Sequence, residues 1–308
     1  MTETRATGNS EIMPPVKEDN ARSTSTFRLR SPILWLASPT LVLLMFFAGP
    51  IAILAWFSFG DRGRTGTGAL TLENYRAVTK PIFLTVALDT VIVATVAIIL
   101  IMAISYPLAY IIAFRSGNWE VPFLLALVLA DGLNPLIKIH SWRPVLGRGG
   151  VVNTVLQGAG VIDEPLDWLI FSRFAVIVVL ATGFLPYAVI PIYAAMKTVP
   201  KSLLEASRDL GSNWFVTFTK IVMPLTATGF LVVMVIVFLP ILSAFAAPAL
   251  VGGTDGFMLS SLIEDEFLNR GQWGIGAALS LVLLAASGVF VWLSYKITNI
   301  KRLGTGGG

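Results

Sequence analysis

Six long apolar stretches, separated by polar segments, most constrain what this chain of 308 residues can fold into. An α-helix needs about 20 mainly apolar residues to cross the ~30 Å hydrocarbon core of a bilayer. Charged residues make up 13% of the chain, against about 25% in soluble domains. The sequence therefore predicts an all-α integral membrane protein with six transmembrane helices. They are expected at about Pro32–Phe59, Ile82–Phe114, Val121–Ile137, Phe174–Met196, Leu225–Leu250 and Ile275–Ile297.

The composition argues against several kinds of active site. The chain has no cysteine, which excludes disulfides, Cys-ligated metals and thiol catalysis. Its one histidine, His140, is too few for a histidine metal cluster and speaks against a Ser-His-Asp triad. No Gly-x-x-x-x-Gly-Lys-Ser/Thr sequence occurs, so the chain has no phosphate-binding loop of its own. We expect a protein that is not an enzyme, with no cofactor or metal in this chain and no nucleic-acid partner.

The polar segments indicate how the chain is organised around the membrane. Residues 1–31 are rich in Ser, Thr, Glu and Pro and are expected to form a disordered cytoplasmic tail. Residues 32–303 are the predicted six-helix domain, and the Gly-rich residues 304–308 a flexible tail. Most of the 22 Lys and Arg residues lie on the segments that share a side with the N-terminus. This bias favours a cytoplasmic location for both termini.

The polar segment 197–224 has the pattern of two short helices set at an angle. Ser202-x-x-Glu205 fits a capping box at the start of the first helix. Gly211 suits the left-handed position that follows a helix, and Asn213 can cap the second helix. Leu203, Leu204 and Leu210 can share one side of the first helix. On pattern alone, the segment could equally be an amphipathic connector lying on the membrane.

The spacing within this segment favours a more specific interpretation. Glu205-Ala206-Ser207, three residues, Gly211, nine residues and then Ile221-x-Met223-Pro224 resembles the EAA loop of binding-protein-dependent ABC importer permeases. Two positions depart from that family motif: Ser207 replaces Ala and Met223 replaces Leu. The resemblance implies a type I ABC importer permease-like fold whose cytoplasmic coupling helix docks on a separate ATPase subunit. The coupling residues it indicates are Ser202, Leu203, Leu204, Glu205, Ala206, Ser207, Asp209, Gly211, Ile221 and Pro224.

The same resemblance implies a set of partners. These are a second, homologous permease subunit, expected to be a different chain, and two ABC ATPase subunits that hold ATP and Mg²⁺. A periplasmic or extracellular solute-binding protein would deliver the solute, and membrane lipid would surround a multi-pass chain in the cell (inner) membrane. The expected function is to translocate a small solute at the expense of ATP hydrolysed by the partners.

Leu72-Glu73-Asn74-Tyr75 is similar to a stretch that follows the first span in many permeases of this family. Two other stretches, Tyr106-Pro107-Leu108-Ala109-Tyr110 and Leu136-Ile-Lys-Ile-His-Ser-Trp142, resemble sequences in permeases of the spermidine/putrescine type. These two suggest a polyamine or another small cation as the solute. The alternatives are an importer permease for a different small solute, such as an amino-acid derivative, thiamine or phosphonate, or a stand-alone secondary transporter. The latter would favour internal inverted repeats, which the sequence does not show.

A small set of polar residues is expected to meet the solute. Asp131 lies inside a hydrophobic span, where a carboxylate costs roughly 2.5–3.5 kcal/mol on insertion scales. We expect it to face a cavity or a partner, and it is grouped with three other candidates, Asn134, Lys138 and Tyr106. Glu264, Asp265 and Glu266 could attract cations at the outer mouth. The alternative is that Asp131 pairs with Lys138 or caps a helix break, while the acidic trio meets the binding protein or water.

Overall fold

The structure is a computed structural model that describes residues 39–60 and 70–305, with side chains up to residue 296. The predicted tail 1–31 lies outside the described residues. Those that are described form two units, one ending at Gly49 and one beginning at Pro50. The described residues contain helices and no strand. The helices are α2 Gly49–Phe59, α3 Glu73–Val78, α4 Pro81–Phe114, α5 Glu120–Asp131, α6 Pro135–Leu146, α7 Val151–Gly158, α8 Arg173–Lys197, α9 Lys201–Asp209, α10 Trp214–Thr217, α11 Met223–Leu225, α12 Ala227–Val233, α13 Leu239–Leu242, α14 Leu259–Glu264 and α15 Trp273–Thr305.

Four continuous helices are long and apolar enough to cross a membrane: Pro39–Phe59, α4, α8 and the part of α15 from Trp273 to Lys296. The side chains from Leu41 to Phe47 in the first unit are all more than half exposed. An apolar helix with its side chains exposed in this way is suited to lipid rather than water. With 34 residues and a rise of 1.5 Å per residue, α4 is about 51 Å long and exceeds the hydrocarbon core.

Two expected breaks and one expected end differ from the structure. Pro186 and Pro191 lie inside the expected fourth span, where proline would be expected to break a helix; this expectation is wrong, because α8 continues through both. Prolines are tolerated inside membrane helices where neighbouring helices and local adjustments satisfy the freed backbone groups, and Pro186 is buried against such neighbours. The last helix continues to Thr305, so it extends into residues 304–308, which were expected to form a flexible tail.

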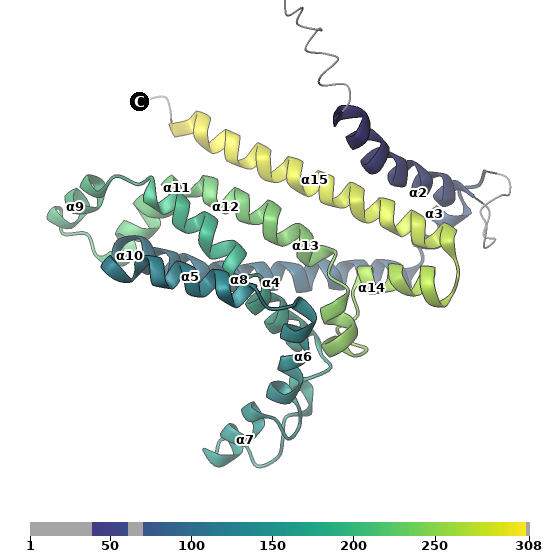
Figure 1. Ribbon diagram of the computed structural model, residues 1–308, viewed down its shortest axis with the longest axis horizontal. Helices are drawn as coiled ribbons and strands as arrows, with labels where there is room; N and C mark the ends of the chain where they lie inside the picture. The colour runs from purple at the N-terminus through teal and green to yellow at the C-terminus, as the bar shows by residue number, and fades with distance from the viewer. Residues whose placement is uncertain (1–38, 61–69, 306–308) are drawn as a thin grey trace, which may run out of the picture. The chain divides into compact units, whose positions relative to one another are not determined.

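The remaining two spans are bent pairs of helices. The segment Gly117–Asp131 meets Pro135–Gly158 at 91°, and Trp214–Leu225 meets Ala227–Leu242 at 67°. The third span was expected to reach Ile137 with a break between Asp131 and Pro135, and the break is confirmed: α5 ends at Asp131, α6 begins at Pro135, and α6 leads away from α5 (Figure 1). The fifth was expected to reach Leu250, but the helix ends at Leu242 and Pro248–Gly252 forms a separate π-helical turn. Counting each pair as one crossing gives six spans.

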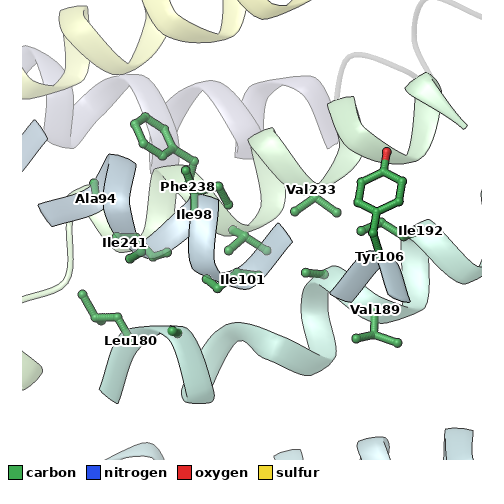
Figure 2. Close-up of a cluster of buried hydrophobic side chains, with 14 of the residues drawn as sticks. Ala94, Ile98, Ile101, Tyr106, Leu180, Val189, Ile192, Val233, Phe238 and Ile241 are labelled. Atoms are coloured by element: carbon green, nitrogen blue, oxygen red, sulfur yellow. The ribbon is translucent and has the colours of Figure 1, made fainter. Parts of the chain in front are cut away.

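The main core of the second unit lies where α4, α8 and the α12–α13 segment pack together. Alanines let two helix backbones approach closely, and Ala97 and Ala109 on α4 and Ala188 on α8 are completely buried. Larger side chains fill the space between the helices; Figure 2 shows Ile101, Ile192, Val233 and Ile241 gathered there. This contact fixes α8, whose C-terminal end leads into α9.

A smaller cluster joins α3, α14 and the start of α15. Asn74, from the Leu72–Tyr75 stretch, is completely buried, and its amide donates to the backbone oxygens of Ser58 at 3.1 Å and Gly60 at 2.8 Å. A Cβ on Gly274 would lie 2.6 Å from the Asn74 amide nitrogen. The glycine therefore lets α15 approach α3, and Asn74 ties the end of α2 to the same place.

Candidate coupling surface and solute cavities

The first helix of the predicted coupling segment, α9, begins differently from the sequence expectation. Pro200 occupies the N-cap position with an extended backbone, and no side chain caps the helix. Ser202 lies inside the helix, so the predicted Ser202-x-x-Glu205 capping box is wrong. Proline presets the backbone for a helix start and has no N–H that would need a cap. The Pro200 carbonyl instead accepts from the Leu203 N–H at 3.1 Å.

The end of α9 is as predicted. Gly211 has φ +75°, in the left-handed region. The Gly211 N–H donates to Arg208 O at 2.8 Å, and the Ser212 N–H donates to Ser207 O at 3.0 Å. These two bonds form a Schellman motif, which satisfies the last carbonyls of a helix. The chain therefore turns sharply after Leu210 and enters a second short helix.

The second helix is fixed by two polar contacts. The Asn213 side-chain oxygen accepts from the Val216 N–H at 2.8 Å, which confirms its predicted capping role. Ser207 and Thr217, both buried, have hydroxyl oxygens 2.8 Å apart and join α9 to α10. Ser207 is one of the departures from the family motif, and its hydroxyl supplies a bond that alanine could not make.

Aromatic contacts anchor α10 to the C-terminal part of α4. Trp214 stacks on Phe218 with ring centroids 5.3 Å apart. The Tyr110 ring meets Trp214 edge-on at 5.8 Å. Aromatic pairs in these geometries stabilise by about 0.5–1.5 kcal/mol beyond their buried area. Lying at one end of the long helices (Figure 1), α9 and α10 are thus fixed to the spans rather than suspended from them.

The side chains of this segment divide into a buried and an exposed set. Leu204 is 6% exposed and faces the core, whereas Leu203 is 43% and Leu210 86% exposed. The expectation that these three leucines share one side is therefore wrong. Phe215 is also 64% exposed. The exposed set also contains polar side chains, those of Ser202, Glu205 and Asp209. Among the other predicted coupling residues, Ala206 and Pro224 are exposed and Ile221 is half-buried.

A cavity of about 320 Å³ lies at the elbow between α5 and α6. Lys138 Nζ is 3.0 Å from Asp131 Oδ1, and it also donates to the Asp131 backbone oxygen at 3.1 Å. The Tyr187 hydroxyl of α8 donates to Asp131 Oδ2 at 2.6 Å. All three residues line the cavity. The structure thus gives Asp131 the Lys138 partner that the sequence analysis had left open, while the part played by this carboxylate in solute movement stays a prediction.

The other two path candidates lie apart from this pair. The Asn134 side chain accepts from the Leu136 N–H at 2.8 Å and caps α6, so it shapes the elbow. Tyr106 is 4% exposed and meets Phe218 edge-on, with centroids 6.0 Å apart. It lines neither of the two cavities described here. The structure therefore brings Asp131 and Lys138 together but does not place Tyr106 with them.

A second tie between α5 and α8 was missed from the sequence. Glu120, at the start of α5, is 2.8 Å from Lys197 Nζ, and it accepts from the Tyr193 hydroxyl. The two carboxylates at the ends of α5 thus bind tyrosines six residues apart on α8. Glu120 and Lys197 are 77 residues apart in sequence, so no local pattern indicates the contact. The one signal in the sequence is that both residues lie at the ends of spans.

The three acids predicted at the outer mouth have different surroundings. Glu266 is 1% exposed, with Oε1 3.0 Å from Arg270. Burial raises the pKa of its carboxyl above the ordinary value, against the effect of Arg270. Asp265 also contacts Arg270, at 2.8 Å. Glu264 instead lines a cavity of about 730 Å³ beside α13, α14 and α15. The three therefore do not face one mouth together.

Comparison with known proteins shows the family of this chain. A family described as the binding-protein-dependent transport system inner membrane component matches residues 22–299. The chain belongs to this family. It is a multi-pass inner-membrane protein and the permease subunit of an ABC importer, so it serves transport and is not an enzyme. Membership of this family also implies an ATPase and a solute-binding protein as partners.

Individual relatives cover most of the chain. It is 31% identical over 264 residues to the spermidine/putrescine transport system permease protein PotB of Escherichia coli, which covers 85% of this chain and 96% of PotB. It is 27% identical over 292 residues to the inner membrane ABC transporter permease protein YdcU of the same organism, covering 90% and 88%. A chain of a bacterial ABC transporter that imports alginate matches with a TM-score of 0.72 and 18% identity, over 88% of this chain and 98% of that one. This last likeness confirms the type I importer permease fold.

Proposed function

We propose that the chain is the permease of a polyamine importer, moving spermidine, putrescine or a similar small cation. The observation that carries the proposal is the 31% identity with PotB over 96% of the PotB chain. The stretches at Tyr106–Tyr110 and Leu136–Trp142, which resemble polyamine-type permeases, support it. A carboxylate in each of two cavities, Asp131 and Glu264, also suits a positively charged solute.

The proposed assembly contains this chain, a second homologous permease, two ATPase subunits and a solute-binding protein. ATP and Mg²⁺ bind to the ATPase subunits, and both termini of this chain are cytoplasmic. The excess of Lys and Arg on the segments that include α9 supports this orientation. A reporter that is active only in the cytoplasm should work when fused after Met196 and fail after Asp255. The reverse result would refute the orientation.

The coupling step that we propose is mechanical. The exposed apolar set on α9 and α10, with Leu210 and Phe215, docks in a groove of the ATPase subunit. Movement of that subunit displaces α9, and three residues separate α9 from the end of α8. α8 in turn carries Tyr187 at the elbow cavity. ATP binding shifts the conformational equilibrium only if the ATPase contacts α9 differently in the two states.

Uptake by the reconstituted complex tests the solute. The purified complex is placed in liposomes with ATP inside and its own binding protein outside, and labelled putrescine and spermidine are offered. We expect uptake that needs both ATP and the binding protein. The control is the same complex with an ATPase subunit that cannot hydrolyse ATP. Absence of polyamine uptake by a complex that hydrolyses ATP when binding protein is added would reject the polyamine assignment.

One observation favours a second candidate, a zwitterionic solute. The elbow cavity contains both signs of charge, with Lys138 beside Asp131, and such a pair could bind the two ends of an amino-acid derivative. A relative of 26% identity, covering 67% of this chain, is the osmoprotective compounds uptake permease protein GgtC of Synechocystis. Glycine betaine is therefore added to the uptake panel, and its transport in place of polyamines would support this candidate.

A further inference from the structure

The larger cavity lies between α13, α14 and α15 and is open rather than enclosed, and its lining belongs to no part of the coupling machinery. Figure 1 shows α14 far from α9 along the long helices. The cavity volume of about 730 Å³ lies within the range of about 300–1,000 Å³ found for small-molecule sites. Ser260 and Glu264 are four residues apart and lie on one face of α14. Ser280 and Ser287, seven residues apart, lie on one face of α15. The polar part of the lining therefore comes from α14, α15 and Ser243, which follows α13.

Three of the four serine hydroxyls that line this cavity, those of Ser243, Ser260 and Ser280, already donate hydrogen bonds to backbone oxygens. Ser260 donates to the Ala244 backbone oxygen at 2.5 Å, and Ser280 donates to the Gly276 oxygen at 2.8 Å. Ser243 donates to the Leu239 oxygen at 3.2 Å. A hydroxyl has one proton and two lone pairs, so each of these oxygens can offer only acceptor sites to a ligand. The polar lining therefore favours a ligand that donates hydrogen bonds.

Glu264 adds a negative charge to this lining, so the lining favours a hydrogen-bond donor that is positively charged. Glu264 is the only charged residue among the described residues that line the cavity, and no Lys or Arg lines it. The basic residue nearby in the sequence, Arg270, contacts Asp265 and Glu266 instead. An ionised carboxylate accepts hydrogen bonds and donates none. The cavity thus presents one negative charge among hydroxyl acceptors.

The remaining wall is apolar. It suits methylene groups and consists of Leu239, Pro240, Phe245, Ile263, Leu283 and Leu284. A ligand that matches both parts has ammonium groups, which donate and carry positive charge, joined by an alkyl chain. Charge-assisted hydrogen bonds between an ammonium and a carboxylate are about twice as strong as neutral ones.

We propose that this cavity binds an alkylammonium group of the transported solute, with Glu264 as its counter-ion and Ser243, Ser260 and Ser280 as acceptors. The inference rests on the proposed polyamine transport and adds to it a site beside α14, away from α9. Asp265 and Glu266 are not part of the site, because Arg270 contacts both. Loss of the Glu264 charge should therefore weaken solute handling without affecting the coupling surface.

The first test measures uptake kinetics in the assembled complex. We expect Glu264→Gln to raise the KM for spermidine about tenfold, as loss of a charged hydrogen-bond partner does, while ATP hydrolysis stimulated by the binding protein persists. Glu264→Asp keeps the charge, so its KM for spermidine should lie between those of the wild type and Glu264→Gln. Glu164→Gln is the matched control, because Glu164 is exposed and does not line the cavity; its KM should stay at the wild-type value.

A second measurement does not depend on transport. Since the chain has no cysteine, Ser287→Cys introduces the only thiol of this subunit, and its reaction with a small cationic thiol reagent can be followed by mass. Spermidine at about ten times its dissociation constant should slow the reaction about tenfold, because it competes for the site. Val161→Cys, at an exposed position elsewhere, should react at the same rate with or without spermidine.

The outcomes separate the two proposals. Wild-type uptake of spermidine with an unchanged KM in Glu264→Gln would refute this site and leave the polyamine function intact. An unprotected thiol at position 287 would refute it in the same way. Failure of the wild-type complex to take up any polyamine would reject the proposed function and this inference together.

Discussion

At the scale of a single residue, Gly211 is the position on which the shape of the coupling segment most depends. Its φ of +75° suits glycine, because a left-handed backbone costs other residues roughly 1–2 kcal/mol. No heavy atom lies within 4 Å of the position a Cβ would take. A side chain here therefore meets backbone strain and not a steric clash, so substitutions separate the two effects cleanly.

We expect Gly211→Val to reduce ATP-driven uptake about tenfold, because a β-branched residue opposes the turn and a strain of about 1.4 kcal/mol corresponds to a factor of ten. Gly211→Asn should retain most of the uptake, since asparagine tolerates this conformation better. Uptake per ATP hydrolysed is the measurement, with membrane insertion checked for both variants. Equal uptake by the two variants would show that the left-handed turn is not needed.

The sequence predicted the role of a residue correctly where its partners are close by in the chain. Gly211 and Asn213 were predicted correctly because a helix end and a helix cap are made by neighbouring residues. The predicted capping box at Ser202 is wrong because the N-cap position is Pro200, two residues earlier, and no side chain caps the helix. Tyr187 and Glu120 were missed because their partners lie 56 and 77 residues away, and only the fold brings them together.

At the scale of elements, α5 is joined to α8 by a carboxylate at each of its ends. Asp131 accepts from Tyr187, and Glu120 accepts from Tyr193 and contacts Lys197. The side chains of Asp131 and Lys138 are 31% and 21% exposed, so removal of one charge leaves the other partly buried. Such a loss costs about 1–3 kcal/mol, whereas replacing both partners with uncharged groups can be nearly neutral.

A double-mutant cycle therefore tests what the elbow pair does. We expect Asp131→Asn to lower the melting temperature of the purified complex, and Asp131→Asn combined with Lys138→Met to recover most of it. If the pair only holds the elbow, uptake should recover as well. Recovery of stability without recovery of uptake would contradict a purely structural role and would place Asp131 on the path of the solute.

The spans themselves were predicted better than their interruptions. Apolar length located the four continuous helices and the two bent pairs, which make six crossings when each pair is counted as one, because the bilayer sets that length. The sequence could not tell which polar or proline residues would bend a helix. Pro186 and Pro191 remain within α8, while Asp131 and Pro135 flank a turn of 91°. The difference lies in tertiary context: α8 is packed along the core, whereas Asn134 caps a new helix at the elbow.

At the scale of the whole second unit, α9 and α10 lie at one end of the long helices, and α14 lies far from them along these helices (Figure 1). The exposed apolar set belongs to α9 and α10, and the Glu264 cavity lies beside α14. α8 leads directly into α9 and also lines the elbow cavity. A permease that is driven from the ATP side and loaded from the other side requires this separation.

The contact between α9 and the ATPase subunit is tested most directly by cross-linking. Leu210 is 86% exposed, and Leu210→Cys provides the single thiol of this chain for a short reagent that joins thiols to amines. We predict a cross-link to the ATPase subunit in the assembled complex whose yield changes when ATP binds, and none from Val161→Cys. A cross-link from Val161→Cys, or its absence from Leu210→Cys in a complex that transports, would contradict the assignment of α9 as the coupling helix.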